Sequence, residues 1–254
     1  MLTVLSRVSA MSTTRAGTTI VALTACAMLL AAVWQHSAAI PLAVIDMASY
    51  QADGRIFGAQ VADKLGQSLA AGDFNGDGME DILVGADEAD GPGNARTAAG
   101  EAYVIFGSAG LGTFDIANSE QNLTILGDDS SDHLGTPLAT GDFNGDGFAD
   151  AVVASRFADG PGDGRQDAGE VYLVFGSAEM GGVIDTASAQ QDVTIYGADP
   201  SDHLAASLAV GDVNGDGIDD LLLGTHDGDG PGNTRSGGGE DFSSPPPYPS
   251  ALLS

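Results

Sequence analysis

A segment of about 70 residues is repeated three times along this chain, and no other feature restricts its fold as strongly. The sequence GDFNGDG begins at Gly72 and recurs 69 residues later at Gly141. It returns as GDVNGDG at Gly211, another 70 residues along the chain. A second landmark keeps the same register, since EAYVIFGS at Glu101 matches EVYLVFGS at Glu170. Because independent landmarks agree, the chain repeats one structural unit.

Within each unit, short apolar and β-branched runs alternate with Gly, Pro, Asn and Asp, which is typical of strands joined by tight turns. No stretch after residue 40 shows a helical period. Four strands in 69 residues is the size of a long propeller blade, whereas β-helices use much shorter repeats. Because a closed propeller has about four to eight blades, the sequence predicts an all-β, incomplete or open β-propeller with three blades of four antiparallel strands. In the second repeat the predicted strands are 123–126, 134–140, 150–155 and 171–175.

The repeats divide the chain into predicted units at 40–108, 109–178 and 179–240. The third unit is truncated, because the strand expected after Glu240 is replaced by DFSSPPPYPSALLS. Pro residues lack the backbone donor that a strand ladder needs. Residues 241–254 are therefore predicted to be a disordered tail, as if the gene product were cut short.

Residues 1–39 have the composition of a signal peptide. Arg7 and Arg15 precede an apolar run over 18–34, and small residues stand just before Ile40. A cleaved signal and an uncleaved anchor are both compatible with this run. The single cysteine, Cys26, lies inside it, so no disulfide stabilises the rest of the chain. The protein is predicted to be secreted or displayed at the cell surface.

The charge balance excludes some partners. Eight Lys and Arg residues stand against 36 Asp and Glu residues, a formal net charge of −28. Such a chain repels phosphate backbones and anionic membrane surfaces, so nucleic-acid binding is excluded. Membrane contact is expected only through the N-terminal segment, if that segment is not cleaved.

Each repeat contains the pattern Asp-x-Asn-x-Asp-Gly-x-x-Asp, which places four hard oxygen donors within nine residues. Two carboxylates about 4 Å apart repel each other by roughly 4 kcal/mol at an effective dielectric near 20, and a divalent cation reverses that sign. Glycine at position six permits the sharp turn, and a carbonyl at position seven would add a ligand, which favours Ca²⁺ over Mg²⁺. The predicted metal ligands, for about one Ca²⁺ in each of three loops, are Asp73, Asn75, Asp77, Met79 and Asp81; Asp142, Asn144, Asp146, Phe148 and Asp150; and Asp212, Asn214, Asp216, Ile218 and Asp220.

Two other interpretations compete with this one. An EF-hand needs a glutamate at position twelve and flanking helices, but that position holds Val84, Val153 or Leu223 and the flanks resemble strands. Alternatively, Asn-Gly and Asp-Gly merely close hairpins. Three copies, each with an acid at position nine, favour the metal loop.

The three segments GDFNGDGMEDILVGA, GDFNGDGFADAVVAS and GDVNGDGIDDLLLGT resemble the calcium loop and following strand of FG-GAP repeats, as found in the N-terminal β-propeller of integrin α chains. The resemblance covers about residues 45–240. It implies that the loop joins the first two strands of a blade and binds Ca²⁺ through positions one, three, five and nine. It also implies that 55–58 belongs to an outer strand that lacks a blade of its own.

Other polar residues are given structural roles. His133 and His203 share a repeat position that Lys64 fills in the first copy, which is not expected of a catalytic group. The acidic loop that follows the second predicted strand, with its repeated arginine, is interpreted as a solvated loop closed by an internal Arg–Asp contact, with a ligand-facing surface as the alternative. The sequence shows no catalytic constellation, so the chain is predicted not to be an enzyme.

Three hypotheses of function follow. The first is an exported calcium-binding recognition or adhesion module of the integrin-α type, with an extracellular protein or glycan as its ligand and further propeller blades supplied by another chain. The second is the non-catalytic propeller portion of a truncated secreted hydrolase. The third is a truncated product that folds only in part.

Overall fold

A computed structural model describes residues 2–4, 53–225, 227–228 and 240–243. Its contacts divide the chain into two units, Met1–Val4 with Gly54–Ser254, and Leu5–Asp53. Most of the predicted signal peptide therefore lies outside the described residues. Within the described part, no helix combines the length and the apolar character that a membrane crossing requires.

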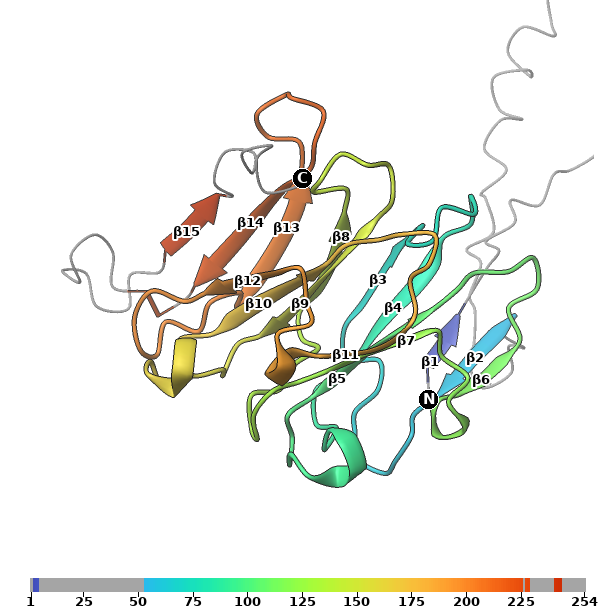
Figure 1. The fold of residues 1–254 in the computed structure, drawn as a ribbon, viewed down its shortest axis with the longest axis horizontal. Helices are drawn as coiled ribbons and strands as arrows, with labels where there is room; N and C mark the ends of the chain where they lie inside the picture. Colours follow the sequence, from blue (N-terminus) through green and yellow to red (C-terminus); the bar gives the residue numbers. More distant parts are fainter. Residues whose placement is uncertain (1, 5–52, 226, 229–239, 244–254) are drawn as a thin grey trace, which may run out of the picture. The chain divides into compact units, whose positions relative to one another are not determined.

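The described fold is all-β, as predicted (Figure 1). Two four-stranded antiparallel blades and a three-stranded one follow each other along the chain. The first blade has the order β7-β5-β4-β3, the second β12-β10-β9-β8, and the third β13-β14-β15. The strands of the first blade are β3 (Leu69–Gly72), β4 (Asp81–Ala86), β5 (Glu101–Ile105) and β7 (Leu123–Leu126). Those of the second are β8 (Leu138–Gly141), β9 (Asp150–Ser155), β10 (Glu170–Val174) and β12 (Val193–Tyr196). Those of the third are β13 (Ser207–Gly211), β14 (Asp220–Thr225) and β15 (Glu240–Ser243).

A fourth sheet precedes the first blade. It consists of β1 (Leu2–Val4), β2 (Gly54–Phe57) and β6 (Thr113–Asp115), with β2 in the centre. The strand β2 occupies the repeat position of the outer strands β7 and β12, as the resemblance to FG-GAP repeats implies. In the described part of the chain, no strand of the third blade pairs with this sheet. The described blades therefore do not close into a ring, consistent with the predicted incomplete or open propeller.

The first two blades have the four antiparallel strands that were predicted, and the structure adds two parallel strands that were not. After β5 the chain crosses to the preceding sheet, where β6 pairs in parallel with β2. After β10 it does the same, and β11 (Gly182–Asp185) pairs in parallel with β7. We call these two segments straps. Each strap ends in a short 3-10 helix, η2 (Ile116–Asn118) or η4 (Thr186–Ser188), whose N-cap is the aspartate that closes the strand. In this way the first blade is joined to the sheet before it, and the second blade is joined to the first.

Two of the four predicted strands of the second repeat, 123–126 and 150–155, have the predicted bounds. The strand predicted over 134–140 begins only at Leu138, because Pro137 has no N–H to donate to a ladder. The strand predicted over 171–175 is shifted by one residue to Glu170–Val174. The tail predicted over 241–254 is also wrong at its start, since β15 continues to Ser243 and pairs with β14. The first proline of that stretch is Pro245, so the backbone donors of β15 are intact.

The blades stack on each other, and successive residues of a strand serve different interfaces. In β4, Leu83 faces the second blade, whereas Val84 faces β2 and η2, and both are fully buried. In β9, Val153 faces the first blade and Val152 faces the third. Because both faces of a central blade are covered, its strands are apolar at almost every position rather than alternately.

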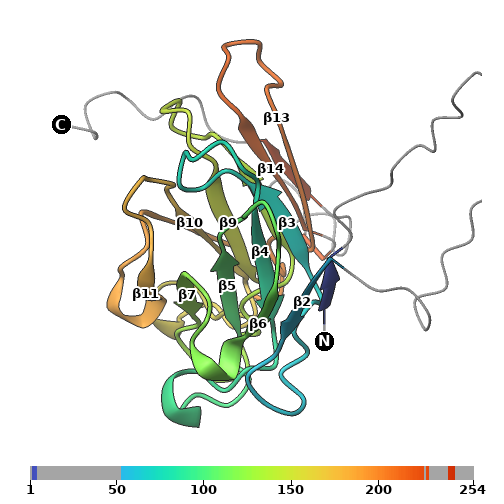
Figure 2. The same cartoon turned by 90° about the vertical axis from the view of Figure 1, so that its right-hand side faces the viewer.

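The innermost strands β3, β8 and β13 contact one another in sequence. Figure 2 shows β3, β9 and β14 as strands of successive blades. The backbones of neighbouring blades also approach each other closely. A Cβ added at Gly85 would lie 1.9 Å from the carbonyl oxygen of Gly135 in the next repeat. Thr140 Oγ1 also donates a hydrogen bond to the Ala71 carbonyl across the two blades. These contacts fix the spacing between blades and thereby the position of the loops at their ends.

Candidate metal loops

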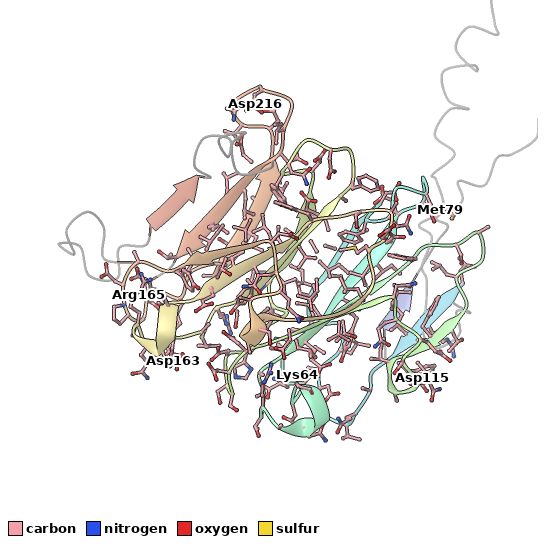
Figure 3. The ribbon with its side chains drawn as sticks, in the orientation of Figure 1. Lys64, Met79, Asp115, Asp163, Arg165 and Asp216 are labelled. Carbon is pink, nitrogen blue, oxygen red and sulfur yellow. The ribbon has the colours of Figure 1, made fainter. Side chains whose placement is uncertain are left out.

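The three acidic loops join the first two strands of their blades, β3 to β4, β8 to β9 and β13 to β14, as the resemblance implies. Figure 3 shows Met79 in the first loop and Asp216 in the third. Arg165 and Asp163, in the connection between β9 and β10, lie away from them in the same view. The candidate metal residues therefore share one end of the blades, and the second set of acidic loops lies at the other end.

Each loop is wound around the carboxylate at position one. In the second loop, Asp142 Oδ1 accepts hydrogen bonds from the N–H groups of Gly145 at 2.7 Å and Asp146 at 3.1 Å. Asp142 Oδ2 accepts a bond from Gly147 N at 2.9 Å. Gly145 and Gly147 have φ of 75° and 88°, a region that side chains with a Cβ rarely adopt. Asp73 and Asp212 make the same three bonds in their own loops.

Positions three and five point into the same turn. In the second loop, Asn144 Oδ1 accepts a hydrogen bond from Asp146 N, and Asp146 Oδ1 accepts one from Phe148 N, both at 2.9 Å. The first and third loops repeat these bonds at distances of 2.8 and 2.9 Å. Three of the four predicted side-chain ligands in each loop therefore lie in one turn, and each keeps lone pairs that accept no bond.

The acid at position nine ties the loop to its blade. Asp150 is fully buried, and its two oxygens accept hydrogen bonds from Phe143 N and from Gly176 N, which follows β10. Burial raises the pKa of Asp150 to about 7, although the two N–H donors oppose the shift and the charges of Asp146 and Asp142 add to it. Asp81 is equally buried, and burial raises its pKa too. In the third loop Asp220 accepts bonds from Val213 N and Asn214 N.

The side chain at position seven covers the preceding loop. A Cβ at Gly76 would lie 2.5 Å from Cε1 of Phe148, and a Cβ at Gly145 would lie 3.4 Å from Ile218. Met79, in the first loop, is 39% exposed. The sequence predicted only that the carbonyl at position seven binds the metal. The structure shows that the side chain at this position packs on the loop of the preceding repeat.

The loops supply only oxygen donors, and no described Lys, Arg or His forms an ion pair with the acids of the first two loops. This donor set suits a hard divalent cation. However, in none of the loops do three carboxylate oxygens lie within 4.8 Å of one another. Among the described residues only Asp128, Asp129 and Asp132 meet that condition. The acids of each loop are therefore not gathered as closely as those of this cluster.

The cluster of Asp128, Asp129 and Asp132 was not predicted from the sequence. Asp132 is 6% exposed, and its pKa is raised to about 9, chiefly by burial and then by the charge and hydrogen bond of Asp128. The repeated aspartates Asp63, Asp132 and Asp202 marked the position in the sequence, but only the second repeat has two neighbouring acids, since the third has Asp199 alone and the first has none. A protonated Asp132 explains how these acids coexist at neutral pH.

The repeated arginine does not close its own loop, so the predicted internal Arg–Asp contact is wrong in its partner. Arg96 forms a bidentate ion pair with Asp185 of the strap β11, at 2.7 and 2.8 Å. It also donates a hydrogen bond to the Gly127 carbonyl. The partner lies 89 residues along the chain, and local sequence gave no signal of it.

The two histidines pack against one aromatic ring. His133 and His203 meet Phe157 edge-on, with ring centroids 5.4 and 5.5 Å apart. Lys64, His133 and His203 all have positive φ, between 50° and 59°. The three residues therefore adopt the same backbone conformation at the equivalent turn of each repeat. This common turn gives the position a structural role.

Comparison with known proteins agrees with this geometry. The sequence model of the FG-GAP repeat family matches residues 65–105, 135–174 and 204–239. This chain carries three FG-GAP repeats. Each match begins before an acidic loop, and the first two end in the third strand of their blades.

The FG-GAP repeats are shared with two kinds of protein. The chain is 34% identical over 167 residues to human phosphatidylinositol-glycan-specific phospholipase D, which covers 64% of this chain and 18% of that protein. It is 30% identical over 179 residues to integrin alpha-PS2 of Drosophila melanogaster, covering 68% of this chain and 12% of the integrin. Integrin alpha-V of Gallus gallus is 30% identical over 164 residues, or 63% of this chain and 13% of the integrin. The chain thus spans less than a fifth of the length of each of these relatives.

Proposed function

We propose that this chain is an exported, calcium-binding FG-GAP propeller module that recognises an extracellular protein or a glycan. One observation carries the calcium proposal: all three loops form the same turn around the carboxylate at position one, with the same side chains directed into it. Export is inferred from the apolar N-terminal segment, which lies outside the described residues. Recognition is inferred from the similarity to integrin α chains, and fold similarity alone does not fix the ligand.

In this proposal the ion has a structural role. The ligands would be the side chains at positions one, three, five and nine, together with the carbonyl at position seven. The side-chain ligands of each loop include three carboxylates within nine residues, and bound Ca²⁺ offsets their mutual repulsion. Since the loops also stack on one another through Phe148 and Ile218, an ordered loop stabilises the interface between blades. A site filled at 100 times its Kd adds about 2.7 kcal/mol to the free energy of unfolding.

Isothermal titration with Ca²⁺ tests the assignment. Asp142→Asn removes one charge from the second loop without changing its shape, and Asp163→Asn removes one charge from an exposed position in the connection between β9 and β10. We expect about three calcium ions per chain, with a loss of at least tenfold in affinity at one site in Asp142→Asn. Asp163→Asn is expected to stay within about twofold of the original chain. Equal effects of the two substitutions would overturn the assignment of the loops.

A second function is favoured by the similarity to the phospholipase, namely the propeller portion of a secreted hydrolase. The 34% identity to that enzyme is at least as high as the identities to the integrins. In this case, too, the chain itself is non-catalytic. An assay of the purified chain on a glycosylphosphatidylinositol substrate, with and without Ca²⁺, tests this point. Turnover by the chain alone would contradict a non-catalytic module.

A further inference from the structure

The outer strand of the first blade shows what a strap does when it is in place. The strap β11 pairs with β7 over four residues, from Gly182 with Leu123 to Asp185 with Leu126. At its start, Gly182 N donates a hydrogen bond to the Asn122 carbonyl. Under this cover every residue of β7 is buried. The strap is therefore a full edge strand of the first blade, although it belongs to the next repeat.

Side chains fasten the end of the strap. Asp185 forms the bidentate ion pair with Arg96, and its Oδ1 also accepts a hydrogen bond from Ala187 N at the start of η4. The next residue, Thr186, is 5% exposed and donates a hydrogen bond from Oγ1 to the Leu126 carbonyl at 2.9 Å. The strap is thus recognised by its backbone, by one carboxylate and by one hydroxyl.

The second blade has an outer strand equivalent to β7, but without a strap paired to it in the described part of the chain. Its outer strand β12 is the last strand of its sheet in the described part of the chain. None of its residues is buried, and Tyr196 is 44% exposed, whereas the equivalent Leu126 in β7 is 8% exposed. An edge of this kind presents a row of backbone donors and acceptors.

The arginine that would hold a strap is also present. Arg165 corresponds to Arg96 in the repeat, and it donates hydrogen bonds to the carbonyls of Gly197 and Ala198, as Arg96 does to Gly127. Among the residues that the structure describes, Arg165 forms no ion pair. Its guanidinium lies beside the end of β12, where the carboxylate of a strap belongs.

We propose that β12 and Arg165 form a docking site for an extended apolar segment that ends in aspartate, which adds to the second blade as a parallel strand and places its carboxylate on Arg165. The chain's own straps define the chemistry of this partner, an extended apolar run that ends in Asp, as in GVID and TFD. A second copy does not supply it from its described strands, because β6 is already paired with β2 and β11 with β7. Addition of a strand to an exposed edge is a common mode of peptide recognition.

A labelled peptide with the sequence of residues 181–191, GGVIDTASAQQ, tests the proposal by fluorescence anisotropy on the full chain. We expect saturable binding, weakened about tenfold when the peptide carries the equivalent of Asp185→Asn or when the protein carries Arg165→Gln. The two changes together are expected to weaken binding no further than either one. The matched control is Arg156→Gln in the same blade, which removes an arginine that stacks on Phe157 and should leave binding unchanged.

Other results would overturn the proposal. Binding that depends on Arg96 and not on Arg165 would mean that the peptide replaces β11 on the first blade. Equal binding by the original chain and by Arg165→Gln would show that Arg165 is not part of a docking site. The same conclusion follows if binding does not saturate up to about 1 mM, since a Kd of about 1 mM corresponds to only about 4 kcal/mol of binding free energy. Analytical ultracentrifugation measures whether the chain forms a dimer. A dimer that dissociates when the peptide is added would mean that a second copy of the chain occupies the site.

Discussion

The ion pair between Arg96 and Asp185 offers the sharpest test of the strap. The two residues belong to different repeats, and the pair forms only if β11 lies on the first blade. Exposed ion pairs contribute about 0.2–1 kcal/mol, whereas hydrogen bonds to charged groups contribute about 1.5–3 kcal/mol. Since the pair is bidentate and each side chain is 22% exposed, we expect a coupling energy of about 1–2 kcal/mol.

A double-mutant cycle with Arg96→Gln and Asp185→Asn measures this coupling, from urea unfolding of the four chains at pH 7. The ion pair and its hydrogen bond lower the pKa of Asp185. Its contribution is therefore present above the unfolded pKa of about 3.9 and is lost as the pH falls through the lower folded pKa. Arg165→Gln in place of Arg96→Gln is the matched control, because the arginine that pairs with Asp185 is Arg96. A coupling energy within about 0.3 kcal/mol of zero at pH 7 would refute the claim that the Arg96–Asp185 ion pair holds β11 on the first blade.

Two further predictions concern the blades themselves. Burial raises the pKa of Glu170 to about 7, so its carboxyl stabilises the fold below about pH 4.5 and costs stability as the pH rises through 7. Glu170→Gln should therefore raise the free energy of unfolding by up to about 3 kcal/mol at pH 8 and leave it unchanged at pH 4. The glutamine still offers an oxygen that accepts the hydrogen bond of the Tyr172 hydroxyl. An unchanged urea midpoint at pH 8 would contradict this prediction. Gly85→Ala should destabilise the chain by about 1–3 kcal/mol or more in thermal melts, because its Cβ would meet the Gly135 carbonyl. Gly110→Ala, with no atom within 4 Å, is the control and should stay within about 0.5 kcal/mol, and equal melting points would contradict the close approach of the blades.

The candidate site was predictable to the extent that its chemistry is local. The turn around Asp142 depends on residues within nine positions of each other, so the order of Asp, Asn and Gly was sufficient to predict it. The buried state of Asp150 was not predictable in the same way. Its second hydrogen bond comes from Gly176, 26 residues away, and only the packed blade brings that N–H to the loop.

The sequence by itself determined the repeat, the all-β fold and the place of the acidic loops between the first two strands of a blade. These features follow from residue types at short spacing, which fix backbone turns and strand periods whatever the rest of the chain does. The tertiary structure decided the straps, the partner of Arg96 and the open edge of β12. The straps and the Arg96 ion pair join residues 59–89 positions apart, and their energy arises from surfaces that exist only after one blade has packed against the next.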